Sequence, residues 1–257
     1  MKKTKIICTM GPATDNEDVL RDLMLNGMDV ARLNFSHGSH EEALERINRI
    51  KKVRDELNIP VAILLDTKGP EVRIKDFKEG KVELKEGQKF TLCTDDVVGD
   101  ENQVSITYAN LPNDVKVGSK ILIDDGLIEM EVISVKNSKI LCKVKNGGVV
   151  SNKKGVNVPN VALSMPYMSQ KDIDDILFGI EQDVDFIAAS FVRTADDIRE
   201  IKTLLRDNGG RDIRIIAKIE NAEGVDNIDD IIRETHGIMV ARGDMGVEID
   251  MHDLPVL

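Results

Sequence analysis

The first part of the chain alternates between short apolar runs and stretches in which apolar residues recur every three or four positions. Residues 5–9, 29–33 and 61–66 are largely apolar runs of strand length. The last run is almost continuous, which is typical of parallel strands covered on both faces. The stretches between the runs have the apolar spacing of one face of a helix. The pattern therefore predicts the order strand, helix, strand, helix, strand over residues 1–69.

Polar residues indicate where the helices begin. Thr14 is followed three residues later by Glu17, which is the spacing of a capping box. Ser39, Ser169 and Thr194 stand in the same way before amphipathic stretches. Because a side-chain oxygen at the N-cap satisfies a free backbone N–H of the first turn, we expect a helix to open at each of these four positions.

The pattern changes between about residues 69 and 158. Short runs rich in Val, Ile, Leu and Thr alternate there with Gly and Asn turns, and no helical face is recognisable. The expected strands are residues 81–84, 89–92, 120–123, 127–133 and 139–145. This part of the sequence indicates a separate all-β module, which we delimit as residues 70–157.

After Pro159 the first pattern resumes. Residues 185–189, 214–218 and 237–241 are predicted strands, separated by amphipathic stretches, and one helix is expected to carry the apolar residues between 225 and 232. With the three earlier runs this makes six strands and one insertion after the third strand. We therefore expect three segments: residues 1–69 as the first part of one domain, 70–157 as the inserted module, and 158–257 as the second part.

Strict alternation of strands and helices means a parallel sheet, either doubly wound or a (β/α)₈ barrel. Charged or hydroxyl side chains stand at the ends of successive strands, including Arg32, Asp66, Ser190 and Lys218. A barrel builds its site from the carboxyl ends of many strands, whereas a doubly wound sheet has one switch point and usually a Gly-rich first turn. The sequence contains neither GxGxxG after its first strand nor a P-loop. It thus favours a TIM-type barrel, incomplete at about six strands.

Composition narrows the class of function. The 257 residues have a net charge of −11, 41% hydrophobic residues, 3% aromatic residues and no tryptophan. Such a chain has enough apolar material for a packed core but lacks the basic, aromatic surface of a nucleic-acid binder. No run approaches the roughly 18 apolar residues of a membrane helix, and no signal-peptide core follows the first residues. We expect a cytoplasmic protein with neither nucleic-acid nor membrane partners.

Three cysteines, Cys8, Cys93 and Cys142, are far apart in the sequence and form no CxxC pair. Their number and spacing indicate neither a disulfide framework nor a zinc site. Buried free thiols are the expectation.

Lys218 and Glu220 are two positions apart at the end of a predicted strand, so they share one face. A solvated ion pair is the simpler interpretation. However, the apolar residues 215–217 before them indicate that the lysine emerges from a dry core, where a cation stabilises a developing anion well. Asp244 supplies a second carboxylate at the next strand end, and two carboxylates with substrate oxygens suit Mg²⁺. Gly243 leaves backbone N–H groups open to an anion.

Arg32, Asn34 and Ser36 alternate at another strand end, and Asp66 and Thr67 follow the third strand. Their amide, hydroxyl and carboxylate oxygens suit a hard cation, and the guanidinium suits phosphate. Simple loop capping is an equally good interpretation of Asn34 and Ser36 from the residues alone.

Two further patterns have weaker functional interpretations. His37 and His40 could be taken as a metal pair, but their spacing and the composition of the loop are unspecific, and a surface role is expected. Residues 242–244 spell the cell-adhesion tripeptide Arg-Gly-Asp, which the predicted position at a barrel mouth argues against.

Several long motifs occur in order and resemble one known family. They are residues 5–14 (KIICTMGPAT), 31–38 (ARLNFSHG), 66–73 (DTKGPEVR), 153–159 (KKGVNVP), 216–221 (IAKIEN) and 239–248 (MVARGDMGVE). On these motifs the chain resembles the pyruvate kinase family over its whole length. The resemblance implies a (β/α)₈ barrel interrupted after its third strand by a mobile β lid. It also implies that the sequence stops before the last two barrel strands and the C-terminal regulatory domain of the family.

The resemblance implies transfer of a phosphoryl group from phosphoenolpyruvate to ADP, giving pyruvate and ATP in glycolysis. Lys218 would contact the transferring phosphoryl group and the enolate oxygen. Glu220 and Asp244 would hold Mg²⁺ or Mn²⁺, and the amides of Gly243 and Asp244 would receive the substrate carboxylate. Arg32 would bind phosphoryl oxygens as a substrate-binding and catalytic residue.

For the nucleotide, the resemblance implies binding by Asn34, Arg73 and Lys154, with Arg73 also on phosphoryl oxygens. It further implies a K⁺ site, whose ligands would be Asn34, Ser36, Asp66 and Thr67. Glu71 matches the residue typical of potassium-dependent members of the family, so the resemblance implies a requirement for K⁺. Full-length members are usually homotetramers. The alternative is a catalytically inactive fragment that keeps phosphate-binding and metal-binding residues or acts by interaction.

Overall fold

A computed structural model describes residues 3–249, 252 and 254 of the chain. The contacts divide the chain into two units. The first unit comprises Met1–Gly69, Tyr167–Ile219 and Asn227–Met239, and the second comprises Pro70–Pro166, Glu220–Asp226 and Val240–Leu257. Each unit is described by itself below.

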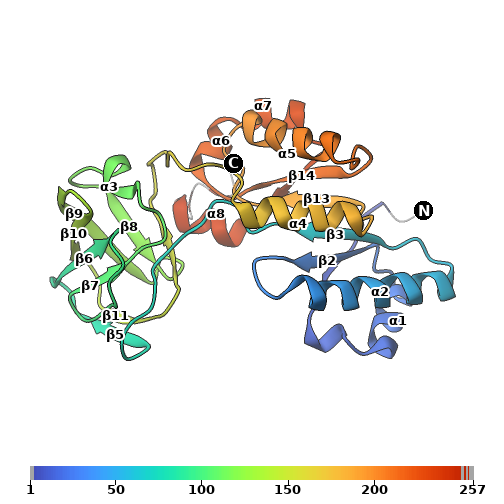
Figure 1. The fold of residues 1–257 in the computed structure, drawn as a ribbon, viewed down its shortest axis with the longest axis horizontal. Coiled ribbons are helices and arrows are strands. Elements are labelled where there is room, and N and C mark those ends of the chain that lie inside the picture. The colour runs from blue at the N-terminus through green and yellow to red at the C-terminus, as the bar shows by residue number, and fades with distance from the viewer. Residues whose placement is uncertain (1–2, 250–251, 253, 255–257) are drawn as a thin grey trace. The chain divides into compact units, whose positions relative to one another are not determined.

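The first unit is built on a six-stranded sheet (Figure 1). Its strands, in spatial order, are β1 (Ile7–Thr9), β2 (Val30–Asn34), β3 (Ala62–Asp66), β13 (Phe186–Ala189), β14 (Arg214–Ile219) and β15 (Gly237–Val240). The four pairs from β1 to β14 are parallel. The predicted six strands, with the insertion after the third, are confirmed, and the sheet corresponds to an incomplete TIM-type barrel.

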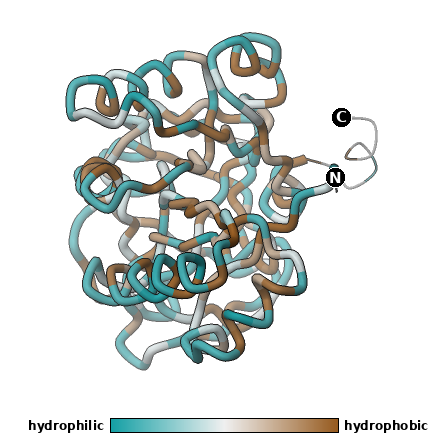
Figure 2. Tube along the Cα trace, turned by 90° about the vertical axis from the view of Figure 1, so that its right-hand side faces the viewer, coloured by the Kyte–Doolittle hydropathy of each residue, from teal (hydrophilic) through white to brown (hydrophobic). Residues whose placement is uncertain are grey.

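Helices of the first unit lie along this sheet (Figure 1). They are α1 (Glu17–Leu25), α2 (His40–Leu57), α4 (Gln170–Glu181), α5 (Ala195–Asp207) and α7 (Ile228–Glu234). In Figure 2 the coiled segments carry both hydrophilic and hydrophobic stretches. The apolar side is buried: Ile47 and Ile50 of α2 and Ile198 of α5 are at most 1% exposed. Burial of this apolar stripe stabilises the helices more than their intrinsic propensity does.

The N-caps confirm three of the four predicted helix starts. Ser39 accepts a hydrogen bond from Glu42 N, Ser169 accepts one from Asp172 N, and Thr194 is the N-cap of α5. The prediction that Thr14 opens the first helix is wrong. Thr14 closes a short 3₁₀ helix, η1 (Pro12–Thr14), and Asn16 caps α1 instead. Pro12, with its fixed φ, favours this separate turn before the helix.

The helix expected to carry residues 225–232 is two helices. They are α6 (Ala222–Asp226), in the second unit, and α7. Asn227 separates them, and its side-chain amide donates to the carbonyl oxygen of Arg193 at 3.1 Å. Asparagine readily leaves helical geometry when its side chain finds such a partner, which the apolar spacing does not reveal.

The second unit contains a seven-stranded sheet and a small hairpin. The sheet order is β4 (Val72–Arg73), β12 (Gly155–Asn157), β8 (Lys120–Ile123), β9 (Ile128–Lys136), β10 (Lys139–Val144), β6 (Lys89–Cys93) and β7 (Gln103–Ser105). The hairpin pairs β5 (Lys81–Leu84) with β11 (Gly148–Ser151). Three helices also belong to this unit: α3 (Leu111–Asp114), α6 and α8 (Arg242–Glu248).

All five predicted strands of the inserted module are present, with ends that differ by at most three residues. Four strands and the helix α3 were missed: β4, β7, β11 and β12 have two to four residues each, and α3 has four. Segments this short do not display a period of alternation. No helix in the described part of the chain is long and apolar enough to cross a membrane.

The expected free thiols are confirmed, since Cys8, Cys93 and Cys142 form no disulfide. Cys93 and Cys142 are buried, whereas Cys8, on β1, is only partly buried. Burial raises the pKa of Cys142 to about 12 and raises that of Cys93. Thiols with raised pKa values are poor nucleophiles, which fits a packing role.

Candidate active site

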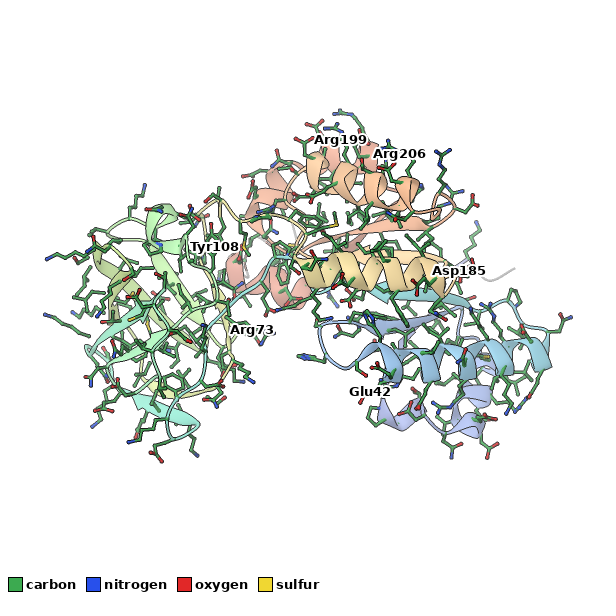
Figure 3. The ribbon with its side chains drawn as sticks, in the orientation of Figure 1. Glu42, Arg73, Tyr108, Asp185, Arg199 and Arg206 are labelled. Carbon is green, nitrogen blue, oxygen red and sulfur yellow. The ribbon has the colours of Figure 1, made fainter. Side chains whose placement is uncertain are left out.

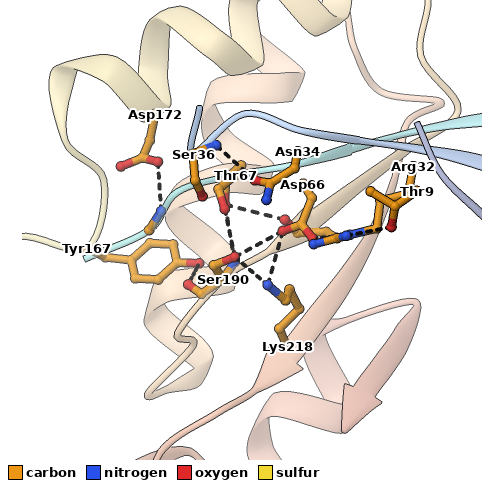
Figure 4. Close-up of polar contacts among 12 residues, drawn as sticks. Thr9, Arg32, Asn34, Ser36, Asp66, Thr67, Tyr167, Asp172, Ser190 and Lys218 are labelled. Carbon is orange, nitrogen blue, oxygen red and sulfur yellow. Dashed lines mark hydrogen bonds and ion pairs between the residues drawn. The ribbon is translucent and has the colours of Figure 1, made fainter. Parts of the chain in front are cut away.

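The carboxyl ends of four neighbouring strands in the first unit bring polar side chains together (Figure 4). β2 ends at Asn34 and β3 at Asp66, and these two residues are register partners. Ser190 directly follows β13, and Lys218 lies near the end of β14. Because parallel strands present their carboxyl ends at one edge, residues up to 152 positions apart in sequence become direct neighbours.

Lys218 is the buried cation of this site. Its Nζ donates to Ser190 Oγ at 2.8 Å and to Asp66 Oδ1 at 3.1 Å. The side chain of Lys218 is 10% exposed and that of Asp66 is 1% exposed. An ammonium group can stay in such a dry place because a carboxylate and a hydroxyl oxygen replace its water. The prediction that this lysine emerges from a dry core is confirmed.

Arg32 approaches the same carboxylate from the other side. Its Nε lies 2.5 Å from Asp66 Oδ2, and its guanidinium also donates to Thr9 Oγ1 at 2.7 Å. Asp66 therefore serves two cations, Arg32 and Lys218, and the three groups together carry one positive charge in excess. Since the side chain of Arg32 is 24% exposed, part of its donor fork faces solvent. The arrangement can attract a phosphate or carboxylate and hold it by charge-assisted hydrogen bonds.

The sequence did not indicate that Ser190 and Asp66 are the central members of this network. Asp66 was assigned only to a cation site, and Ser190 was noted only as a polar residue at a strand end. In the structure the Ser190 hydroxyl lies 3.0 Å from Asp66 Oδ1, so lysine, serine and aspartate form one buried network. The position of Ser190 directly after a buried strand was the signal that could have found it.

Ser190 is itself fixed by the segments around it. Its N–H donates to Thr67 Oγ1 at 3.1 Å, and its carbonyl oxygen accepts the hydroxyl of Tyr167 at 3.0 Å. Gly69, at φ +70°, passes so close that an added Cβ would lie 2.6 Å from this carbonyl oxygen. The N–H of Gly69 donates to the buried carboxylate of Asp172 at 2.9 Å. Tyr167 and Asp172 thus support the site, and no sequence motif indicated either of them.

Asn34, Ser36, Asp66 and Thr67, the four expected K⁺ ligands, lie within this same region (Figure 4). Asn34 Oδ1 accepts the N–H of Ser36 at 2.9 Å, which closes a tight turn after β2. The donor set consists of amide, hydroxyl and carboxylate oxygens, and it contains no nitrogen or sulfur donor. Such a set fits a hard cation. The loop-capping interpretation of Asn34 also holds, because its side chain caps this turn.

A pocket lies at the amino end of α2. Its lining residues are Met10, Leu33, Asn34, Phe35, His37, Gly38, Ser39, Glu42, Ala43 and Arg46. Glu42 is marked in Figure 3. His37 is exposed, as the expected surface role requires. For His40 that expectation is only partly right: its Nε2 lies 2.7 Å from Asp175 Oδ1, and its ring stacks on Phe178. A metal pair therefore does not describe these histidines.

The expected nucleotide-binding residues of the second unit, Arg73 and Lys154, are each paired with a carboxylate. Arg73, marked in Figure 3, makes a two-pronged contact with Glu71, at 2.8 and 2.7 Å. Lys154 Nζ lies 2.9 Å from Asp124 Oδ1. Glu71, expected to determine potassium dependence, is thus a partner of Arg73.

Glu220 and Asp244, the expected Mg²⁺ ligands, differ in their surroundings. Glu220 is 1% exposed, whereas Asp244 is exposed in the first turn of α8, next to Gly243. Among residues 3–249, 252 and 254 no group of three or more His, Cys, Asp or Glu side chains is placed to hold a metal. Mg²⁺ needs only one or two carboxylates when substrate oxygens and water complete its shell, so these two side chains fit it.

Glu248, at the end of α8, is a further titratable group of the second unit. Its Oε1 accepts a hydrogen bond from Asn157 Nδ2 at 3.1 Å. Burial raises the pKa of the Glu248 carboxyl, and the neighbouring Glu223 raises it further. The contact joins the last residue of β12 to α8. Both residues lie within family motifs, at 153–159 and 239–248, but the sequence did not indicate their contact.

Alternating strands and helices, with two cationic side chains around one aspartate at the strand ends, define this chain as a barrel-type α/β protein with a charged cluster at the carboxyl edge of its sheet. A family model described as pyruvate kinase, barrel domain, matches residues 1–257. The chain belongs to the pyruvate kinase family.

Curated relatives support this assignment. The chain is similar to pyruvate kinases from Clostridium perfringens, at 50% identity, Staphylococcus haemolyticus, at 51%, and Geobacillus stearothermophilus, at 53%. Each match covers 100% of this chain but 54%, 44% and 44% of the respective relative. The chain thus spans about half the length of the curated relatives it matches.

Proposed function

We propose that this chain carries the phosphoryl-transfer site of a pyruvate kinase, an enzyme of glycolysis that converts phosphoenolpyruvate and ADP into pyruvate and ATP. The observation that carries the proposal is the buried ammonium of Lys218, held by Asp66 and Ser190 beside Arg32. The relatives' names, pyruvate kinase, support the same reaction.

Lys218 and Arg32 are the proposed catalytic residues. When the bond between the phosphoryl group and the enolate oxygen breaks, negative charge grows on that oxygen and spreads over the phosphoryl oxygens. A fixed ammonium in a dry site stabilises this charge without having to reorganise water. Arg32 has guanidinium N–H groups facing solvent, and these would bind the phosphoryl oxygens of the incoming substrate. Asp66 and Ser190 keep Lys218 in one orientation.

The remaining roles are proposed from the resemblance to the family. The amides of Gly243 and Asp244 belong to the first turn of α8, where backbone N–H groups lack helical partners, and they would receive the substrate carboxylate. Arg73 and Lys154, together with Asn34, would bind the nucleotide phosphates. To bind these phosphates, the Arg73 guanidinium would leave Glu71 and the Lys154 ammonium would leave Asp124.

Two kinds of metal ion belong to the proposal. Glu220 and Asp244 would hold Mg²⁺ or Mn²⁺, and Asn34, Ser36, Asp66 and Thr67 would hold K⁺, with Glu71 setting the requirement for it. When bound, these ions neutralise oxygen charges of the substrates. The protein's own part is to place its oxygen donors at the strand ends.

The wider biological setting is proposed from the family. We expect a cytoplasmic protein that assembles into a homotetramer in its full-length form. We also keep residues 1–69, 70–157 and 158–257 as the proposed domain division, in which the middle segment is the lid.

A coupled assay tests the proposal. The purified chain is mixed with phosphoenolpyruvate, ADP, Mg²⁺ and K⁺, and pyruvate is followed through lactate dehydrogenase. Lys218→Met should lower turnover by at least about 100-fold, the usual effect of removing one charge-stabilising donor. Lys202→Met removes a partly exposed lysine of α5 that is paired with Glu234 of α7, and it should leave turnover unchanged. Equal turnover in Lys218→Met and wild type would refute the role of Lys218.

The second candidate is a catalytically inactive fragment that binds phosphate and metal. Mn²⁺ titration followed by electron paramagnetic resonance separates the two functions. Tight Mn²⁺ binding without turnover above background identifies the inactive fragment, whereas turnover that saturates with phosphoenolpyruvate identifies the enzyme.

A further inference from the structure

Phe35 stands between Asn34 and Ser36 and is held in three ways. Its N–H donates to the carbonyl oxygen of Asp66 at 2.9 Å, and its ring is buried at 4% exposure. Its carbonyl oxygen accepts a hydrogen bond from Lys171 Nζ at 2.9 Å. The last contact joins residues 136 positions apart in the sequence, and nothing in the proposed chemistry requires it.

Lys171 belongs to a cluster built on a buried carboxylate. Its Nζ lies 2.7 Å from Asp175 Oδ2, and His40 Nε2 lies 2.7 Å from Asp175 Oδ1. The side chain of Asp175 is 1% exposed, whereas those of Lys171 and His40 are 43% and 39% exposed. A buried carboxylate needs such partners to remain charged, so Asp175 holds both of them in place.

The same cluster encloses the ring of Phe35. The rings of His40 and Phe178 stack at 4.5 Å, and Phe35 lies against both, at 6.1 and 5.9 Å between centroids. Two elements, the start of α2 with His40 and the start of α4 with Lys171, thus meet at Phe35. The residue cannot turn its backbone without disturbing its ring.

The planar peptide bond between Phe35 and Ser36 links the Lys171 contact to the cation donors. The carbonyl group of Phe35 and the N–H group of Ser36 belong to one planar peptide unit, so fixing the direction of one fixes the other. That N–H donates to Asn34 Oδ1 at 2.9 Å. The chain of contacts therefore runs from Asp175 through Lys171 and the peptide unit to the side-chain oxygen of Asn34.

We propose that Lys171, fixed by Asp175 and His40, is a positioning residue for the oxygen donors of Asn34 and Ser36, and thereby sets the affinity of the site for K⁺. The inference rests on the K⁺ site of the proposed function. Lys171 itself touches neither substrate nor cation. Loss of its ammonium frees the Phe35–Ser36 peptide to rotate and leaves Asn34 Oδ1 without a fixed direction.

The experiment measures binding of K⁺ without turnover. The melting temperature of the chain is titrated with KCl, and NaCl keeps the ionic strength constant. For Lys171→Met we expect the half-saturating K⁺ concentration to rise about tenfold, the lower end of the usual effect of losing a group that orients a metal ligand. Lys171→Arg, which can still donate to the Phe35 carbonyl, should stay within about twofold of wild type.

Lys51→Met is the matched control. Lys51 Nζ also donates to a main-chain carbonyl oxygen, that of Gln182 at 2.8 Å, but this contact lies at the other end of α4. The Lys51→Met variant should therefore leave the K⁺ titration unchanged. If Lys171→Met fails to fold, His40→Phe takes its place. This variant keeps an aromatic ring against Phe178 but loses the contact with Asp175, and it should weaken K⁺ in the same direction by a smaller factor.

Three results would overturn the inference: a half-saturating K⁺ concentration in Lys171→Met within twofold of wild type, an equal change in Lys51→Met, or no K⁺-dependent stabilisation of the wild type. The coupled assay reports separately on the proposed function. Normal K⁺ binding that weakens in Lys171→Met, in a chain without turnover, would refute the proposed function and support the inference. Turnover by the wild type, together with K⁺ binding that is unaltered in Lys171→Met, would support the proposed function and refute the inference.

Discussion

Asp66 is the residue on which the charge balance of the site depends most. Its carboxylate is 1% exposed and lies 2.5 Å from Arg32 Nε and 3.1 Å from Lys218 Nζ. Replacement of Asp66 by Asn keeps the shape but removes the negative charge that Arg32 and Lys218 share in these contacts. Arg32, at 24% exposure, can take up water in exchange, whereas Lys218, at 10%, can do so far less.

The expected loss of stability follows from this difference. Removal of one partner from a buried pair destabilises a protein by about 3–5 kcal/mol. Because Arg32 is partly solvated, we expect Asp66→Asn to lie at the lower end, at about 3 kcal/mol. With a urea dependence of about 3 kcal/mol per molar for a chain of this length, the unfolding midpoint should fall by about 1 M.

Urea unfolding followed by far-ultraviolet circular dichroism measures this loss. The four longest helices, α1, α2, α4 and α5, all belong to the first unit, so the helical signal reports on the unit that contains Asp66. Asp207→Asn is the control. It removes a carboxylate from an ion pair whose two side chains are more than half exposed, and it should leave the urea midpoint unchanged.

A double-mutant cycle gives the decisive comparison. In the Lys218→Met background the Asp66→Asn change no longer takes a counter-charge away from a buried ammonium, so the double variant should be more stable than the sum of the single effects by about 1 kcal/mol or more. A loss below about 1 kcal/mol for Asp66→Asn alone, or strict additivity in the cycle, would refute the account of Asp66 as the shared counter-charge.

Three further predictions concern other parts of the chain. Burial raises the pKa of Glu248, so the native state binds its proton more tightly than the unfolded state does. The contribution of Glu248 to the free energy of unfolding is therefore greatest at a pH below the ordinary carboxyl pKa of 4.5. It falls as the pH rises through the raised pKa of the folded state. Glu248→Gln should thus melt at a higher temperature than wild type at neutral pH and at the same temperature near pH 4; equal melting temperatures throughout would contradict this. Iodoacetamide followed by mass spectrometry should modify Cys8 in the native protein and reach buried Cys142 only after unfolding. Gly69→Ala should destabilise by more than about 2 kcal/mol in urea unfolding, because φ is +70° and an added Cβ would lie 2.6 Å from a carbonyl oxygen. Gly80→Ala, at φ +76° with open space around it, should have only the smaller backbone effect, and similar losses in both would count against the steric argument.

The order of strands and helices could be predicted because it depends on local periodicity. The runs at residues 61–65 and 215–217 are apolar and continuous, and both lie in interior strands of the six-stranded sheet. Strands of two or three residues, such as β4 and β12, were missed because their pairing is decided by the neighbouring strand. The helix start was wrongly predicted at Thr14 because Thr14, Asp15 and Asn16 are all able to cap a helix, and the local sequence does not show that Asn16 is the N-cap.

The site was predicted in its residue types but not in its connections. The apolar run before Lys218 was enough to indicate a buried ammonium. Its partners Asp66 and Ser190 come from other strands, 152 and 28 positions away, and only the parallel register brings them together. The contact of Lys171 with Phe35, across 136 positions, has no local signal at all.

Direct observation of the phosphoryl group tests the central claim that the buried Lys218 network transfers phosphate between substrates. The chain is incubated with phosphoenolpyruvate, ADP, Mg²⁺ and K⁺ and followed by phosphorus-31 nuclear magnetic resonance. The account predicts that the phosphoenolpyruvate signal is replaced by the γ-phosphate signal of ATP in wild type, and that Lys218→Met shows neither change over the same time. An unchanged rate of ATP formation in Lys218→Met, or release of the phosphoryl group only as inorganic phosphate, would contradict it.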